Sequence, residues 1–167
     1  MGWHIKKNYI SSNIKTSICM AVFNGEKYVT EQISSILSQM GENDELIIID
    51  DSSTDSSVNI VSLISDERIR LFCNDVNQGV NKTFERAILL SKGDDIFLAD
   101  QDDIWIPNRL TIMRDLLVNS TRLLVSSNFT LVNMNGEVMG HQQPDQLRSV
   151  SSDHNYKNII KIFSGNI

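Results

Sequence analysis

The chain has 167 residues, of which 41% are hydrophobic and 22% charged, as in an ordinary soluble globular domain with its own core. The formal net charge of -6 argues against a nucleic-acid partner, because phosphate backbones select basic surfaces. No apolar run is long enough to span a bilayer, and segment 1–14 lacks the apolar stretch of a secretory signal, so we interpret it as an N-terminal extension.

Apolar residues form short continuous runs, typical of buried strands, and stripes spaced three or four residues apart, typical of amphipathic helices. The predicted strands are 17–23, 46–49, 69–73, 96–99 and 123–132. The predicted helices are 28–37, 58–64, 84–90 and 107–119, with a shorter one at 156–163. Gly93 is expected to end the third helix, and Asn135-Gly136 to form a hairpin turn into strand 137–139.

Continuously apolar strands that alternate with helices predict an α/β fold, in which a mostly parallel sheet is flanked by helices and followed by a late hairpin. Residues 15–140 are expected to form this domain, and the polar stretch after it to be a mobile loop. Cys19 and Cys73 lie within apolar runs, which favours buried free thiols and a reducing cytoplasm.

Polar side chains follow three of the predicted strands at the point where each strand ends. They are Asn24, the pair Asp50 and Asp51, and the run 100–103 with sequence Asp-Gln-Asp-Asp. Because parallel sheets bind ligands beyond the carboxyl ends of their strands, we expect these residues to converge on one edge. Clustered carboxylates repel unless a cation, water or hydrogen-bond donors offset the charge, and their hard oxygens suit Mg²⁺ or Mn²⁺ together with phosphate. The alternative is a solvated acidic turn between a strand and a helix.

The acidic pair and the first turn each allow two interpretations. Asp51 can accept a hydrogen bond from a base N–H or a ribose hydroxyl, while Asp50 is expected to face backbone amides of the following loop. Alternatively, the pair are helix N-terminal acids favoured by the dipole. Asn24-Gly25 either places the main chain of 21–23 against a planar base or only ends a strand.

Lys82 and Arg86 lie four residues apart, on one face of the third predicted helix. Near the start of that helix they could meet phosphate oxygens, or they could form a solvated basic face. A phosphoacceptor signalling domain is a poor match, because that class carries an acidic pair after its first strand, where this chain has Asn24.

Four ordered segments, 17–25, 45–55, 77–80 and 97–105, resemble the motifs of the family 2 glycosyltransferases with the GT-A (Rossmann-like) fold, especially bacterial rhamnosyltransferase-like members. The resemblance implies a metal-dependent, inverting transfer of a sugar from a nucleotide-diphosphate donor to an acceptor hydroxyl in surface-polysaccharide synthesis. The alternative is a truncated nucleotide- and metal-binding module without transfer activity.

The resemblance also implies roles for individual residues. Asp51 looks like the base-recognising acid, with Ala21 and Phe23 beside the base, and Asp102 looks like the principal ligand of Mn²⁺ or Mg²⁺. The expected nucleotide-binding residues are Ala21, Phe23, Asn24, Asp51, Lys82, Asp100 and Gln101, and the expected metal ligands are Asp102 and Asp100.

The family's general base follows a glycine-containing segment whose start resembles 164–166, so no catalytic residue is assigned in this chain. Asp145 and Asp153 are carboxylates at the wrong point in the order. Residues 141–167 are therefore expected to contain the loop and the start of an incomplete acceptor-side region. The implied partners are a nucleotide-diphosphate sugar and a saccharide or lipid-linked saccharide, in the cytoplasm or peripherally at the inner face of the plasma membrane.

Overall fold

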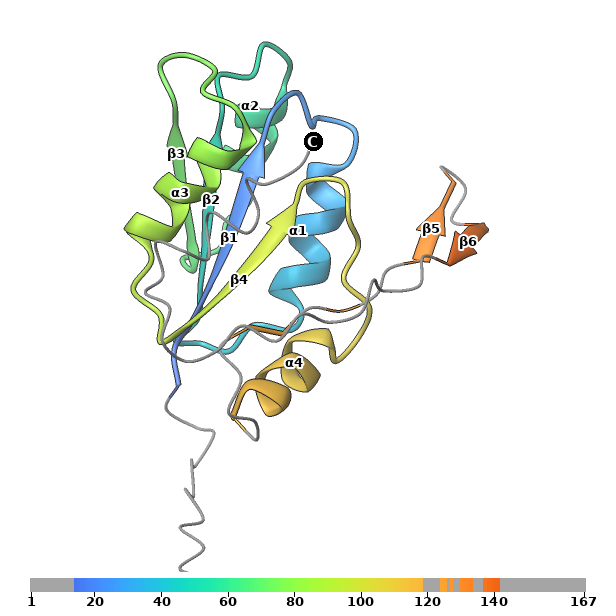
Figure 1. Ribbon diagram of the computed structural model, residues 1–167. Coiled ribbons are helices and arrows are strands. Elements are labelled where there is room, and N and C mark those ends of the chain that lie inside the picture. The colour runs from blue at the N-terminus through green and yellow to red at the C-terminus, as the bar shows by residue number, and fades with distance from the viewer. Residues whose placement is uncertain (1–13, 119–123, 126, 128–129, 134–136, 142–167) are drawn as a thin grey trace, which may run out of the picture.

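The computed structural model describes residues 14–118, 124–125, 127, 130–133 and 137–141. The main sheet has four parallel strands in the order β3-β2-β1-β4 (Figure 1). These strands are β1 (Thr16–Val22), β2 (Glu45–Asp50), β3 (Ile69–Cys73) and β4 (Asp95–Asp100). The helices are α1 (Val29–Leu37), α2 (Ser57–Ser62), α3 (Val80–Leu90) and α4 (Arg109–Val118). A separate antiparallel pair consists of β5 (Thr130–Val132) and β6 (Val138–His141).

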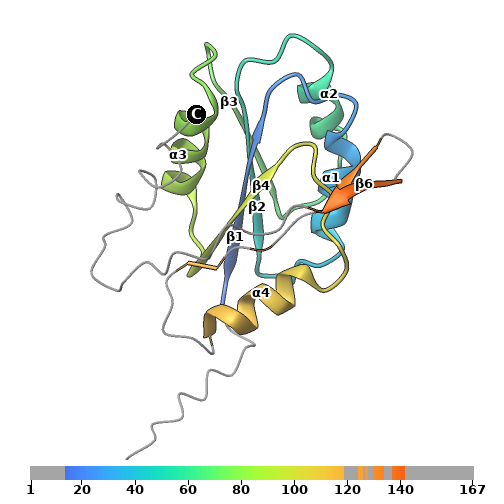
Figure 2. The same ribbon diagram turned by 45° about the vertical axis from the view of Figure 1, so that its right-hand side comes forward.

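Helices cover both faces of the main sheet, with α3 on one side and α1 and α2 on the other (Figure 2). Successive side chains of a strand point to opposite faces. Cys19 of β1 therefore packs with Ala87 of α3, while Ile18 and Met20 pack on the opposite face with Ile33 of α1. The continuous apolar character of β1 and β2 follows from this double coverage.

The predicted parallel α/β fold with a late hairpin is confirmed. The predicted strand 123–132 is wrong in its first part: strand structure begins at Thr130, and Leu124 and Val125 are outside it. A strand needs a paired neighbour, and within the described residues β5 pairs with β6 alone, whereas Val125 packs against the main core. The Asn135-Gly136 turn, helix 156–163 and nearly all of 141–167 lie outside the described residues.

The prediction that Gly93 ends the third helix is wrong. Helix α3 ends at Leu90, and Ser91 already has extended backbone angles (φ -69°, ψ 148°). A Cβ on Gly93 would lie 2.4 Å from the main-chain nitrogen of Ser17. Glycine is therefore required for the close approach of the chain to β1 as it enters β4.

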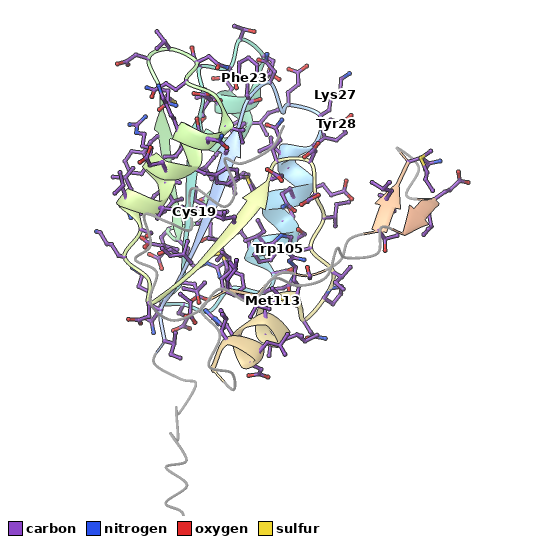
Figure 3. All side chains as sticks on the ribbon, viewed as in Figure 1. Cys19, Phe23, Lys27, Tyr28, Trp105 and Met113 are labelled. Carbon is purple, nitrogen blue, oxygen red and sulfur yellow. The ribbon has the colours of Figure 1, made fainter. Side chains whose placement is uncertain are left out.

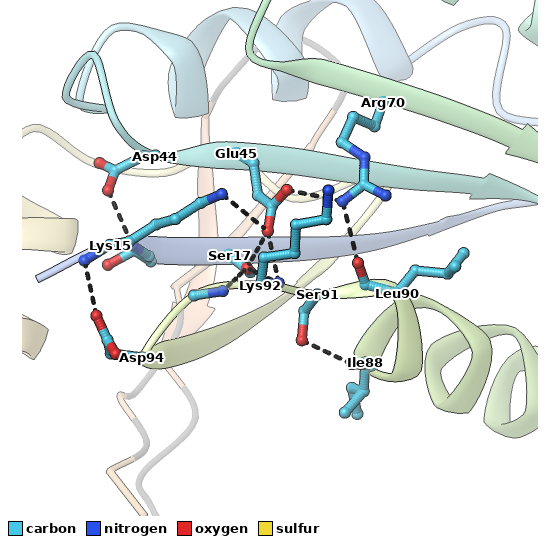
Figure 4. Close-up of polar contacts among 12 residues, drawn as sticks. Lys15, Ser17, Asp44, Glu45, Arg70, Ile88, Leu90, Ser91, Lys92 and Asp94 are labelled. Atoms are coloured by element: carbon cyan, nitrogen blue, oxygen red, sulfur yellow. Dashed lines mark hydrogen bonds and ion pairs between the residues drawn. The ribbon is translucent and has the colours of Figure 1, made fainter.

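An ionic network ties the amino ends of the strands together, at the edge away from the polar strand ends (Figure 4). Glu45 accepts hydrogen bonds of 2.7 Å each from Ser17 Oγ, Arg70 Nη1 and the main-chain N–H of Lys92. Burial raises the pKa of Glu45, but these hydrogen bonds outweigh it and hold the pKa below its usual range. The network joins β1, β2, β3 and the entry to β4. It thereby helps to fix the register of the strands, which determines how their carboxyl ends are aligned at the opposite edge of the sheet.

Candidate functional site

A cavity of about 370 Å³ lies at the carboxyl ends of β1, β2 and β4, next to the start of α3. In the parallel register, Asp100 of β4 is paired with Ala21 of β1, and Asp50 of β2 with Val22. The register therefore brings the ends of three strands to one place. The cavity is lined by Ala21, Val22, Phe23, Asp51, Asn77, Gly79, Val80, Thr83, Asp100, Gln101 and Asp102.

Most of the residues that the sequence predicted for the site do line this cavity. Those that do are Ala21, Phe23, Asp51, Asp100, Gln101 and Asp102. Asn24 and Lys82 are not among the lining residues. Sequence reasoning assigned no individual role to Asn77, Gly79, Val80 or Thr83, although 77–80 was one of the four segments recognised as motifs.

Asp51 is only 3% exposed and accepts three hydrogen bonds from the segment between β3 and α3. Its Oδ1 accepts from Asn74 Nδ2 at 2.6 Å and from the N–H of Gln78 at 2.9 Å, and its Oδ2 accepts from the N–H of Gly79 at 2.8 Å. Burial raises the pKa of Asp51, but these donors and the side chain of Thr83 lower it overall, so the carboxylate is ionised at neutral pH. A carboxylate has about four acceptor sites, so the three bonds leave one further site, which lies on the side of Thr83. Asp51 thus holds the cavity wall at the start of α3 in place.

Gln101 joins the end of β4 to the end of β1. Its Oε1 accepts from the N–H of Phe23 at 2.8 Å, and its Nε2 donates to the carbonyl of Phe23 at 3.0 Å. A Cβ on Gly25 would lie 2.4 Å from Gln101 Oε1, so the paired contact depends on glycine at that position. Both polar groups of the Gln101 amide are therefore engaged with the main chain. Figure 3 shows Phe23 near the carboxyl end of β1.

Asn24 connects two loops and does not face the cavity. It has a left-handed backbone (φ 50°), its N–H donates to Ser53 Oγ at 2.9 Å, and its Oδ1 accepts from the N–H of Thr54 at 2.9 Å. In the same loop pair, Asp55 Oδ2 accepts from the N–H of Glu26 at 3.0 Å. The segments 23–26 and 52–57 are thus interlocked, and the polar residues of the second segment have a structural role.

The two basic residues of α3 also lie away from the cavity. Val80 and Thr83 line it, and Lys82, about 100° around the helix from Thr83, is exposed. Arg86 donates to the carbonyl of Cys73 at 2.8 Å and to the side chain of Asn74. Neither residue is among those lining the cavity, and contact of this pair with phosphate oxygens stays a prediction.

Repelling carboxylates are gathered where β4 ends. Burial, followed by the charges of Asp103 and Asp102, raises the pKa of Asp100. Burial and the charge of Asp102 raise the pKa of Asp103, against the opposing effect of Arg109. A divalent cation would relieve this repulsion.

The donor set at this position fits one kind of metal site. Among the described residues, no group of three or more His, Cys, Asp or Glu side chains is arranged to hold a metal ion. Two carboxylates, those of Asp100 and Asp102, do line the cavity. Mg²⁺ and Mn²⁺ are commonly bound by one or two carboxylates with phosphate oxygens of the substrate completing the shell. The acids therefore fit a cation that is shared with a bound phosphate compound.

Comparison with known proteins gives a consistent family match. The family model described as glycosyl transferase family 2 matches residues 17–166. The chain is 31% identical over 131 residues to the Escherichia coli UDP-Glc:alpha-D-GlcNAc-diphosphoundecaprenol beta-1,3-glucosyltransferase WfgD, covering 78% of this chain and 52% of that protein. It is 36% identical over 105 residues to the putative colanic acid biosynthesis glycosyl transferase WcaA of Escherichia coli (strain K12), covering 62% of this chain and 38% of the relative. The chain thus spans about half the length, or less, of these curated relatives.

Solved structures share the fold. S. aureus TarS 1-349 in complex with UDP-GlcNAc has a TM-score of 0.59 at 24% identity, over 64% of this chain and 32% of that one. The mannosyltransferase PcManGT from Pyrobaculum calidifontis, in complex with GDP-Man and Mn²⁺, has a TM-score of 0.52 at 20% identity, over 62% of this chain and 30% of that one. At these identities the likeness concerns the arrangement of the sheet and helices.

Proposed function

Because the chain belongs to glycosyl transferase family 2, we propose that it binds a nucleotide-diphosphate sugar with a divalent cation and serves in sugar transfer during surface-polysaccharide synthesis. The observation that carries the proposal is the convergence of Asp51, Asp100 and Asp102 on one cavity at the carboxyl ends of parallel strands. The names of relatives in glycan assembly and the UDP-GlcNAc bound by TarS support the choice of donor class.

The nucleoside would lie between the end of β1 and the start of α3. The remaining acceptor site of Asp51 would receive an N–H of the base, and the backbone of Ala21 and Phe23 would flank it. Asp100 would approach the ribose and the diphosphate. Gln101 would act here by holding Phe23, because both polar groups of its amide already bond to that residue. Asn24 would act in the same indirect way through the loops it joins.

Asp102, with Asp100, would hold Mn²⁺ or Mg²⁺ against the diphosphate. When bound, the cation would neutralise the charge that develops on the departing diphosphate. In an inverting transfer, the acceptor oxygen forms a bond to the anomeric carbon while the bond from that carbon to the diphosphate oxygen breaks. The acceptor proton passes to a carboxylate base, to which we assign no residue of this chain.

The acceptor is proposed to be a saccharide or a lipid-linked saccharide, as the diphosphoundecaprenol in the name of WfgD suggests. Residues 141–167 would contribute to the acceptor side. No helix in the described part of the chain has the length and apolarity to cross a membrane. For a lipid-linked acceptor, we propose peripheral contact with the inner face of the plasma membrane.

Thermal unfolding with nucleotides and metal tests the binding proposal. We expect UDP, TDP or GDP to raise the melting temperature in the presence of MnCl₂, because a ligand at 100 times its Kd stabilises a protein by about 2.7 kcal/mol. Asp102→Asn should abolish the Mn²⁺-dependent part of the shift. Asp103→Asn is the matched control, since it removes the same charge from a residue that is not among those lining the cavity. Equal shifts in wild type and Asp102→Asn would refute the assignment.

A second candidate function is binding of the nucleotide and the cation without turnover, because the described site contains residues suited to binding both while no catalytic base is assigned. An assay of sugar transfer and of donor hydrolysis separates the two. Nucleotide and Mn²⁺ binding accompanied by neither reaction would identify a binding module, while either reaction would support the transferase.

A further inference from the structure

Helix α1 carries a fully buried amide on the face that packs against the sheet. Gln32 is 0% exposed and lies next to the buried Ile33. Burying an amide among apolar side chains is unfavourable unless it is hydrogen-bonded. Its Nε2 donates to the main-chain carbonyl of Asp100 at 2.9 Å. An α1 side chain therefore reaches the residue at which the acidic segment begins.

The same face of α1 also holds the other end of that segment. Ser35, one helical turn after Gln32, accepts a hydrogen bond from the N–H of Trp105 at 3.0 Å. The Ser35 hydroxyl lies 3.0 Å from Gln32 Oε1 and 2.8 Å from the main-chain oxygen of Gln32, and its one hydrogen serves these two acceptors. A chain of hydrogen bonds thus runs from Trp105 through Ser35 and Gln32 to Asp100.

Trp105, where this series of hydrogen bonds ends, is itself held in place by packing. The Trp105 side chain is buried and its ring centroid lies 6.2 Å from that of Phe97 on β4. Figure 3 shows Trp105 on the side of the sheet that α1 covers. Segment 100–105 is therefore held at both ends by neighbouring residues of one helix, while the acids between its ends repel one another.

We propose that Gln32 and Ser35 are positioning residues, which hold the two ends of segment 100–105 so that Asp100 and Asp102 present their carboxylates to a divalent cation and a diphosphate. The inference rests on the proposed function, since it concerns the same cavity. Without these hydrogen bonds, repulsion between the carboxylates would move the acidic segment out of this arrangement. Cation binding would then have to reassemble the acids, which weakens the affinity.

The test compares two serines of α1. Ser35→Ala removes the contact with Trp105, and Ser34→Ala makes the same change at the neighbouring exposed position. Gln32→Met removes the donor to Asp100 with little change in side-chain length, and Ser35→Thr restores a hydroxyl. The measurement is the Mn²⁺ dissociation constant of the full chain in the presence of UDP, from the electron paramagnetic resonance signal of free Mn²⁺. Melting curves without metal are recorded alongside.

We expect Ser35→Ala and Gln32→Met to bind Mn²⁺ about 10-fold more weakly than wild type, as is typical when a residue supporting a metal ligand is removed. Ser34→Ala should bind like wild type, and Ser35→Thr should recover most of the affinity. Unchanged affinity in Ser35→Ala and Gln32→Met, even with lower melting temperatures, would show a purely structural role and overturn the inference while the proposed function stands. Should wild type not bind Mn²⁺ with UDP, the proposed function and this inference would both fail. If Gln32→Met does not fold, Ser35→Ala and its threonine rescue decide the outcome.

Discussion

Two adjacent buried aspartates should respond differently to the same substitution. Asp50 and Asp51 are 2% and 3% exposed, so both carboxylates are largely withdrawn from water. Asp51 accepts three hydrogen bonds. Asp50 accepts one, from the N–H of Ser53 at 2.9 Å, as the sequence suggested, and its Oδ1 has no hydrogen-bond partner among the described residues. Asparagine in place of either aspartate removes one acceptor oxygen and the charge.

In Asp51→Asn, one oxygen can still accept from Asn74 and Gln78, but the new amide nitrogen meets the N–H of Gly79. A buried donor left unpaired costs about 1–3 kcal/mol, and each remaining bond loses the charge that strengthens it. We expect a loss of about 3 kcal/mol in the free energy of unfolding. Asp50→Asn loses no hydrogen bond when its oxygen stays towards Ser53, so we expect a change within about 1 kcal/mol.

Urea denaturation followed by far-UV circular dichroism measures both changes. With a slope of about 2 kcal/mol per molar urea, Asp51→Asn should lower the midpoint by about 1.5 M. The pKa of Asp51 is lowered in the folded state, so its contribution is present above the ordinary pKa of an aspartate and is lost as the pH falls through the lowered value. The difference between wild type and Asp51→Asn should therefore shrink on acidification. Equal losses in Asp50→Asn and Asp51→Asn would refute the reasoning.

Three further predictions concern other parts of the described chain. Gly25→Ala should displace the amide of Gln101, reduce the free energy of unfolding by about 1–2 kcal/mol and weaken UDP binding in a titration, whereas unchanged values would contradict the close packing. Arg68 donates a hydrogen bond to Asp66 and lowers its pKa to about 2, although burial opposes the shift. Asp66→Asn should therefore reduce the free energy of unfolding by at most about 2 kcal/mol at pH 7. In urea titrations this reduction should become smaller as the pH falls from about 4 towards 2. Burial raises the pKa of Cys19 to about 12, whereas Cys73 is exposed, so the expectation of two buried thiols is wrong for Cys73. In a Cys73→Ser variant, iodoacetamide at pH 8 should label Cys19 only after unfolding, and rapid labelling of that folded variant would contradict the place of Cys19 in the core.

Sequence predicts the position of some site residues better than that of others. The position of Asp100 and Asp102 at the cavity could be predicted, because a parallel sheet places every strand end at one edge and a continuous apolar run marks where each strand stops. That Lys82 is not among the residues lining the cavity could not be predicted from its charge. Its position depends on which face of α3 lies towards the cavity, and the packing of Ala87 against the sheet sets that face.

The sequence by itself determined the α/β class, the order of the elements and the residues that follow each strand, because these depend on local periodicity and on the geometry of parallel strands. Only the tertiary structure decided how the polar groups are used. Gln32 lies in an ordinary amphipathic helix and becomes a support of the acidic segment only because the register of β1 and β4 brings Asp100 to its amide. Gln101 is likewise engaged with Phe23 through a contact between distant parts of the chain. Hydrogen bonds depend on distances below about 3.5 Å, and such distances between remote residues exist only once the sheet and helices have packed.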